Sequence, residues 1–135
     1  MKKISIITPC YNEEENALID CTNSISKIFS TELNQYHYEH IICDNNSNEE
    51  TVSALKKISS KDKNVKIIFN SKNYGSVKSL FNGIKNSTGD AVLLFFPVDM
   101  QDPPEKITEL VKKWENGFDF VVGCRDQREE FFVMK

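Results

Sequence analysis

The hydrophobic pattern of the chain switches repeatedly between two kinds of segment. Short apolar or β-branched runs, typical of β-strands, occur at residues 4–8, 38–43, 65–69, 91–96 and 118–122. Between these runs, apolar residues recur at helical spacing, as on the buried face of a helix. The members of these faces are Ala17, Leu18, Cys21, Ile25, Ile28 and Phe29; Val52, Leu55 and Ile58; Val77, Leu80, Phe81 and Ile84; and Ile107, Leu110, Val111 and Trp114. Strands that alternate with helices predict an α/β fold, a mostly parallel sheet with helices on both faces.

The apolar run at residues 91–96 is uninterrupted, which predicts a strand buried on both faces. It ends at Pro97, which has no amide proton to donate to a sheet. Asp99, Gln101 and Asp102 follow directly. Because open α/β sheets bind their ligands at the carboxyl ends of the strands, this segment is the candidate active centre. We assign Asp102 mainly to capping the helix that follows.

Local signals predict several helix ends. Ser47 and Glu50 have the spacing of a capping box at the start of the second helix. Gly89 is expected to end the third helix in the left-handed conformation, and Gly117 to end the fourth.

Composition limits the class of protein. A chain of 135 residues with 39% hydrophobic residues suits a single globular domain, and a net charge of -3 argues against nucleic acid as the partner. The four cysteines form no CxxC pair, so we expect reduced, buried thiols in a cytoplasmic protein. The first strand begins too early to leave room for a signal peptide. No apolar run approaches the roughly 20 residues that cross a bilayer.

In a parallel sheet the loops after all strands meet at one edge. Residues 8–11, 44–46, 72–75 and 99–102 should therefore lie close together, with Arg125 beside them. The ring of Tyr11 suits stacking on a base, and Asp44 can accept a ring N–H. Asp99 can ligate Mg²⁺ or Mn²⁺, which prefer oxygen donors. These side chains together indicate a site for a nucleoside diphosphate.

Structural interpretations of the same residues remain open. Tyr11 also fits a partly buried ring with a hydrated hydroxyl, and Asp44 also fits the first position of an Asx turn. Lys72 fits either a phosphate or ribose contact or a solvated loop side chain. Arg125 and Arg128 also fit surface ion pairs, which are worth ~0–1 kcal/mol.

Segments along nearly the whole chain resemble family 2 glycosyltransferases. Residues 4–13 resemble the opening of that family, and residues 41–47 its acidic residue before a Gly-Ser turn. Residues 73–90 are similar to its Asn-x-Gly helix and Thr-Gly-Asp. Residues 99–105 resemble the Asp-Leu-Gln-Asp-Pro-Pro-Glu of the dolichyl- and polyprenyl-phosphate branch, and residues 123–128 its Gly-x-Arg-x-x-Arg. The resemblance implies the GT-A fold, a Rossmann-like α/β fold.

The resemblance also implies roles for individual residues. It places Pro9, Tyr11 and Glu13 around the nucleoside, with Asp44 facing the base. Lys72 is assigned to the donor nucleotide from its place in the loop at the same edge, and not from the resemblance. It implies a metal site at Asp99 and Gln101. Arg125 and Arg128 would bind phosphate, which suits a guanidinium fork.

This sequence departs from the family pattern at two places. Pro97 stands where the family's DxD has its first carboxylate, which leaves Asp99 alone. Asn45 and Asn46 replace the second Asp and the Gly of the Asp-Asp-Gly-Ser turn. Because asparagine tolerates the left-handed conformation better than most residues, we expect the turn to survive.

The function that the resemblance implies is metal-assisted sugar transfer in cell-envelope polysaccharide biosynthesis. The donor would be a UDP- or GDP-sugar, the cofactor Mg²⁺ or Mn²⁺, and the acceptor a polyprenyl phosphate or glycan. Residues 1–135 would be the N-terminal, nucleotide-sugar-binding part of a GT-A domain, cut before the acceptor half, with the catalytic base beyond residue 135. The parent protein would associate with the inner face of the membrane. Apolar residues 131–133 at the cut end are expected to drive self-association.

Other functions were weighed against this one. Since Pro97 weakens the DxD, a nucleotide-sugar-binding module without turnover is the alternative. A signalling receiver domain needs an acidic pair at the end of the first strand, an Asp after the third and a Lys after the fifth. The three strands instead end in residues 8–11, 70–71 and 123–125, which supply none of these. A dinucleotide dehydrogenase is disfavoured because no GxGxxG follows the first strand.

Overall fold

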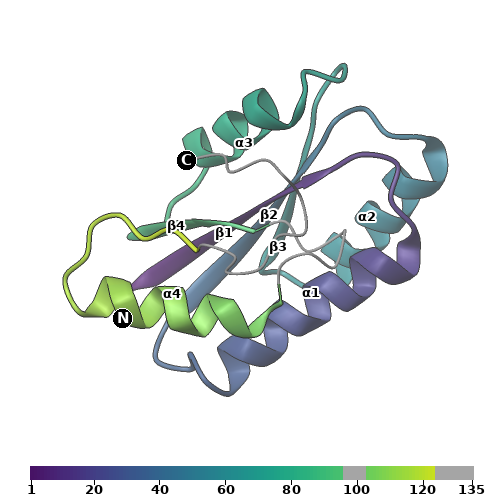
Figure 1. Cartoon of the computed structure of the whole chain (residues 1–135). Coiled ribbons are helices and arrows are strands. Elements are labelled where there is room, and N and C mark those ends of the chain that lie inside the picture. The colour runs from purple at the N-terminus through teal and green to yellow at the C-terminus, as the bar shows by residue number, and fades with distance from the viewer. Residues whose placement is uncertain (96–102, 124–135) are drawn as a thin grey trace, which may run out of the picture.

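Strands and helices alternate through residues 1–95 and 103–123, the part of the chain that the computed structural model describes. The strands are β1 (Lys3–Cys10), β2 (His37–Asp44), β3 (Val65–Phe69) and β4 (Ala91–Leu94). The helices are α1 (Glu15–Ser30), α2 (Glu49–Lys61), α3 (Ser76–Lys85) and α4 (Glu105–Glu115). All strand pairs are parallel, in the order β3-β2-β1-β4. Helix α3 covers one face of the sheet and the other helices lie on the opposite face (Figure 1). The predicted α/β architecture is confirmed.

Strand β1 lies inside the sheet and contributes to the core on both faces. Ile4 and Ile6 pack with α1 and α4, whereas Ile7 packs with the buried residues beneath α3. This alternation follows from the pleat, which sends successive side chains to opposite faces. Almost every residue of β1 is buried, as expected for a strand covered on both faces.

Helix α3 approaches the sheet closely at Gly83. A Cβ atom at this position would lie 2.5 Å from Ile7 Cγ2 and 2.7 Å from Cys43 Sγ. The helix therefore needs glycine here for its contact with β1 and β2. Leu80, one turn earlier, is buried in the same contact.

The prediction that residues 91–96 form a strand buried on both faces is wrong. Strand β4 ends at Leu94, and Val92 and Leu94 are 41% and 43% exposed. The reason is position: among the described residues β4 pairs only with β1, and α3 lies over β1 and β2. Phe96 lies outside the described residues.

Two further predictions from apolar patterns are wrong: the buried face of α3 and the strand at residues 118–122. Val77, Phe81 and Ile84 of α3 are exposed, because the helix meets the sheet through Ser79, Leu80 and Gly83 instead. Residues 118–122 form no strand, and their apolar side chains are largely exposed. No neighbouring strand within the described ranges pairs with them.

Of the predicted helix ends, the one at Gly117 is confirmed, whereas those at Ser47 and Gly89 are wrong. The N-cap of α2 is Asn48, whose side chain accepts a hydrogen bond from the Thr51 amide at 2.9 Å, and not Ser47 as predicted. Gly117 has φ +97° and ends α4 as predicted, but Gly89 is not left-handed. A glycine is needed at position 89 because a Cβ atom would lie 2.6 Å from Ser5 Oγ.

The cysteines in the described part of the chain are free and buried, as predicted: Cys10, Cys21 and Cys43. Burial raises the pKa of Cys21 to about 12 and that of Cys43 to about 11. Burial, followed by the charges of Asp44 and Glu13, raises the pKa of Cys10 well above its usual range. Cys124 lies outside the described residues. None of the helices in the described ranges has the length and apolar content required to cross a membrane.

A buried carboxylate, Glu39, organises the amino-terminal edge of the sheet. Its side chain is 1% exposed and accepts hydrogen bonds from Ser5 Oγ at 2.6 Å and from the Thr88 amide at 2.7 Å. It also forms ion pairs with Lys66 and, at 3.3 Å, with Lys3. Burial by itself would raise the pKa of Glu39, but these hydrogen bonds, from Lys66 above all, lower it from 4.5 to about 2. The cluster ties the α3–β4 connection to β1 and β2.

We predict that Glu39→Gln removes a pH-dependent part of the stability. Because the folded state lowers the pKa, this contribution is complete above pH 4.5 and is lost as the pH falls through about 2. Its size is on the order of 3 kcal/mol. Urea unfolding of wild type and variant should therefore differ by about this amount at pH 7 and converge near pH 2. Glu32→Gln, at an exposed turn position, is the control; equal loss in both variants would contradict the prediction.

Candidate functional site

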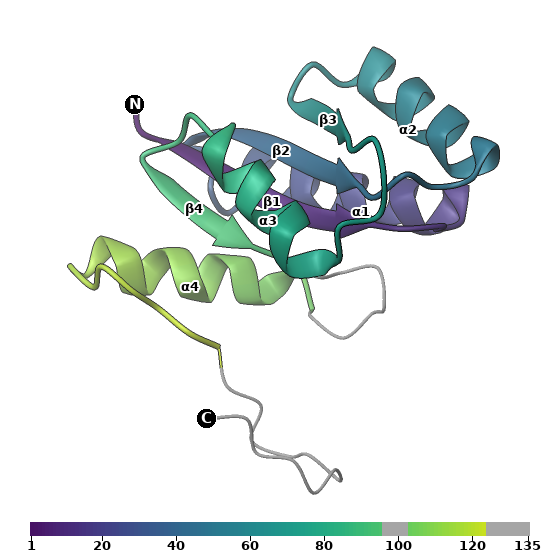
Figure 2. The same cartoon turned by 90° about the horizontal axis from the view of Figure 1, so that it is seen from above.

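The carboxyl ends of β1, β2 and β3 lie side by side. Cys10 is in register with Asp44, and Asp44 with Phe69, which are the last residues of their strands. The loops that follow these strands gather at one end of the sheet (Figure 2). The structure thus brings Tyr11, Asp44 and the loop of Lys72 to one edge, as the parallel topology predicts.

The predicted site residues differ in how accessible they are. Tyr11 is 50% exposed at the end of β1, while Pro9 and Glu13 are half-buried on either side of it. Lys72 is exposed, and its Nζ lies 5.1 Å from the centre of the Tyr74 ring. Tyr11 and Lys72 are thus exposed on the loops after β1 and β3, which leaves this edge open to a ligand.

Asp44 is held firmly from within the protein. Its side chain is 1% exposed; one carboxylate oxygen accepts the Ser47 hydroxyl, and the other accepts the Ser47 amide at 3.2 Å. Asp44 thus stabilises the turn after β2, but its side chain bonds the third residue on and not the second, so this is not the Asx turn of the structural interpretation. The contact of Asp44 with a base stays a prediction.

The loops after β1 and β2 are joined through asparagine and serine side chains. The Asn12 amide donates to Ser47 Oγ at 2.9 Å, and Asn12 Oδ1 accepts from the Asn48 amide at 2.8 Å. Thr51 Oγ1 also donates to the Glu13 carbonyl at 2.8 Å. These bonds explain why Ser47 does not cap α2: its hydroxyl is already used by Asn12 and Asp44.

The turn after β2 has the conformation that the sequence predicted. Asn46 has φ +62°, in the left-handed region where the family pattern has glycine. Asn12 has φ +49° and makes the corresponding turn after β1. Asparagine can adopt this backbone because its short polar side chain bonds locally.

Sequence reasoning missed a second group of polar residues beneath this edge. Asn45, Asn70 and Ser79 are buried and hydrogen-bonded to one another, with Asn82 attached to Asn70. The available signal was the accumulation of asparagines directly after two predicted strands. Taken singly, each of them reads as a turn residue.

Other predicted site residues fall outside the described part of the chain. They are Asp99 and Gln101 at the metal site, Arg125 and Arg128 at the phosphate, and also Pro97 and Asp102. Phe95, the last described residue before that segment, is buried and donates its amide to the Ile7 carbonyl at 2.9 Å. The chain therefore enters the segment beside the second half of β1. Within residues 1–95 and 103–123, no group of His, Cys, Asp or Glu side chains has the arrangement of a metal site.

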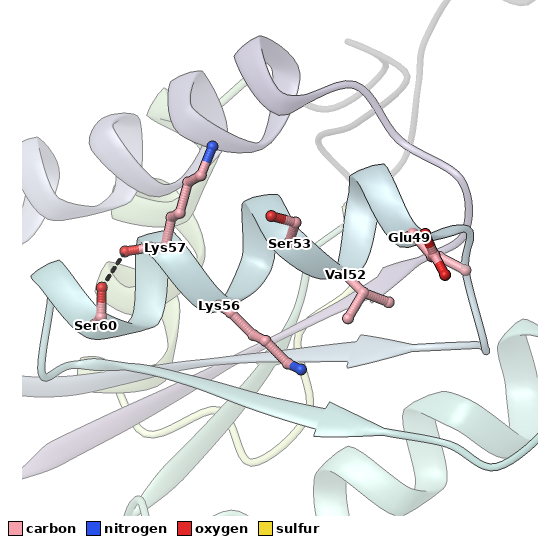
Figure 3. A pocket seen from close by; sticks show the side chains of 7 residues that line it. Glu49, Val52, Ser53, Lys56, Lys57 and Ser60 are labelled. Atoms are coloured by element: carbon pink, nitrogen blue, oxygen red, sulfur yellow. Dashed lines mark hydrogen bonds between the residues drawn. The ribbon is translucent and has the colours of Figure 1, made fainter.

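Two other features were considered as sites. An open groove runs along the outer face of α2 (Figure 3), lined by Ser47, Glu49, Val52, Ser53, Lys56, Lys57 and Ser60. Lys57 pairs with Glu15 at 3.5 Å, and the groove contains none of the predicted site residues. His40 is fully buried; burial lowers its pKa to about 3, and Nε2 bonds Thr8 Oγ1 at 2.8 Å. We therefore do not assign a ligand site to the groove or to His40.

Comparison with known proteins identifies relatives over most of the chain. The model of the family described as "Glycosyl transferase family 2" matches residues 5–133. A bactoprenol glucosyl transferase of Shigella phage SfX is 35% identical over 126 residues, which cover 93% of this chain and 40% of that protein. An undecaprenyl-phosphate 4-deoxy-4-formamido-L-arabinose transferase of Yersinia pestis is 32% identical over 138 residues, covering 100% of this chain and 40% of that protein. The chain thus spans about 40% of the length of these relatives.

A solved structure has the same fold. It is a mannosyltransferase of Pyrobaculum calidifontis in complex with GDP-Man and Mn²⁺, with a TM-score of 0.66 and 18% sequence identity. The likeness covers 82% of this chain and 32% of that one. At this identity it shows the fold alone, the GT-A fold that the sequence predicts.

We predict that the left-handed backbone at Asn46 makes the stability of the protein depend on which residue replaces it. Asn46→Gly should leave the melting temperature nearly unchanged, because glycine adopts φ +62° without steric cost. Asn46→Ala should destabilise the protein by about 1 kcal/mol, the strain of a left-handed β-carbon. Thermal unfolding followed by circular dichroism measures both variants. Equal melting temperatures for the two variants would show that a β-carbon at this position causes no strain.

Proposed function

The chain belongs to glycosyl transferase family 2, and on that premise we propose that it binds a nucleotide-diphosphate sugar at the carboxyl edge of its sheet. The sugar is transferred to a polyprenyl phosphate. The observation that carries the proposal is the shared register of Cys10, Asp44 and Phe69, which brings the family's nucleoside-binding loops to one edge. Residues 1–135 are, in this proposal, the N-terminal donor-binding part of a GT-A domain.

The nucleoside is held by residues after β1 and β2. The exposed ring of Tyr11 stacks on the base, and Pro9 and Glu13 line the pocket around it. Asp44 accepts a ring N–H from the base, while Ser47 keeps the carboxylate in place. Lys72, on the loop after β3, contacts the ribose or a phosphate.

Asp99 and Gln101 hold a divalent metal ion. A carboxylate and an amide oxygen are donors that Mg²⁺ and Mn²⁺ accept, and β4 leads into this segment beside β1. The Mn²⁺ and GDP-Man in the solved mannosyltransferase support a divalent metal in this fold. When bound, the metal neutralises charge on the leaving diphosphate. Arg125 and Arg128 bind the phosphates through their guanidinium forks.

The relatives support a lipid phosphate as the acceptor. The name of the Yersinia pestis relative specifies undecaprenyl phosphate, a lipid phosphate, which supports a polyprenyl phosphate here. The donor is of the UDP or GDP type, and the reaction belongs to cell-envelope polysaccharide synthesis. Such an acceptor places the enzyme in the cytoplasm at the inner face of the membrane. Residues 131–133, outside the described residues, are proposed to promote self-association.

A nucleotide-sugar-binding module without turnover is the second candidate. Pro97 favours it, because it removes the first carboxylate of the DxD and weakens the metal site. If the full-length parent protein binds a nucleotide sugar but transfers no labelled sugar to undecaprenyl phosphate, this module is favoured. Transfer would favour the enzyme.

We predict that the folded chain binds UDP or GDP in a Mn²⁺-dependent way. Isothermal titration calorimetry should detect binding that EDTA removes and that Asp99→Asn weakens at least about 10-fold, because a neutral amide is a poorer ligand for a hard cation. Asp20→Asn, on the exposed side of α1, is the matched control. Absence of binding to either nucleotide by a chain with a normal unfolding transition would refute the proposed function.

A second prediction concerns Tyr11. Tyr11→Ala should weaken nucleotide binding by about 10-fold, since base–aromatic stacking is worth about 1–3 kcal/mol. Tyr11→Phe keeps the ring and should bind within about 2-fold of wild type. If both substitutions had the same effect, the hydroxyl and not the ring face would be the contact.

A further inference from the structure

A fully paired amide network lies beneath the proposed donor site. Asn70 Nδ2 donates to Asn45 Oδ1 at 3.0 Å and to Ser79 Oγ at 3.1 Å. Asn70 Oδ1 accepts from Asn82 Nδ2 at 3.0 Å. Asn70 thus uses both donor hydrogens and its acceptor while being only 9% exposed.

The partners of Asn70 belong to different parts of the site. Asn45 follows Asp44 after β2, whereas Ser79 and Asn82 lie on α3, directly after the loop of Lys72. The backbone reinforces the connection, since the Asn70 amide donates to the Asp44 carbonyl at 2.9 Å. One side chain therefore links the loop after β2, the end of β3 and the beginning of α3.

The fold has other contacts that seat these elements. The β2–β3 ladder places Asp44 beside Phe69, and Leu80 and Gly83 fix α3 against the sheet. What the network adds is a fixed spacing between loops. A fully satisfied buried polar network permits one arrangement and disfavours others, because each alternative leaves a buried group unpaired.

We propose that Asn70 is a positioning residue of the donor site. It holds the turn that carries Asp44 and Asn46 at a fixed distance from the loop that carries Lys72, so that the pocket is formed before the nucleotide binds. Pre-organisation of this kind improves affinity by reducing the ordering cost of binding. This inference rests on the proposed function, because it assigns Asn70 an effect on nucleotide affinity.

The test is a double-mutant cycle read out as nucleotide affinity. The Kd for UDP or GDP with Mn²⁺ is measured by calorimetry for wild type, Asn45→Ala, Asn70→Ala and the double variant. We expect Asn70→Ala to weaken binding by about 10-fold, and the double variant to be no weaker than Asn70→Ala, because both substitutions remove the same link. Asn23→Ala is the matched control, since this asparagine is exposed on α1, away from the Asn70 network.

A purely structural role gives a different result. Urea unfolding of each variant identifies conditions in which all chains are folded, and the Kd is measured there. Lowered stability with a Kd within about 2-fold of wild type, or independent effects of Asn45→Ala and Asn70→Ala, would overturn the proposal. If Asn70→Ala does not fold, Asn82→Ala removes one bond of the network and should weaken binding by about 3-fold. An unchanged Kd in Asn82→Ala would also overturn the positioning role of Asn70. If the wild-type chain binds neither UDP nor GDP, the proposed function is overturned instead.

Discussion

The parallel register between β1 and its two neighbours is the constraint on which the rest of the structure depends. It decides which residues of β1 face α1 and α4 and which face α3, and a slip by one residue would exchange Ile6 and Ile7 between the two faces. The same register aligns Cys10 with Asp44 and Asp44 with Phe69. The proposed donor site is thus set by the pairing that also forms the core, and its loops start from fixed positions.

Helix α3 is fixed by different chemistry along its length. Asn70 bonds Ser79 in the first turn and Asn82 in the second, and close contact at Gly83 seats the last turn against the sheet. Beyond its end, the amide of Thr88 donates to Glu39 at the opposite edge of the sheet. Polar side chains that are buried and paired define position more sharply than apolar contacts, which tolerate sliding. This arrangement suits a helix that begins directly after the loop of Lys72, which is proposed to contact the donor nucleotide.

Much of the fold could be predicted from the sequence because each helix and inner strand carries its own periodicity. The errors concern properties that depend on neighbours. Burial of Val92 depends on what lies beside β4, and the pattern at residues 118–122 specifies a strand only if a partner pairs with it. The cap of α2 was misplaced because Ser47 bonds Asn12, a residue of another loop. The Asn70 network was missed for the same reason: its bonds connect elements that are distant in sequence. The candidate roles of Tyr11, Asp44 and Asp99 came from side-chain chemistry, those of Pro9, Glu13, Gln101, Arg125 and Arg128 from family resemblance, and the meeting of the loops from topology.

The buried thiols have a practical consequence. Only a thiolate reacts rapidly with alkylating reagents, and burial keeps Cys10, Cys21 and Cys43 protonated and shielded. Each therefore becomes reactive only when its own element, β1, α1 or β2, separates from the core. The alkylation rate of each of these thiols in the native protein therefore measures how often its element opens.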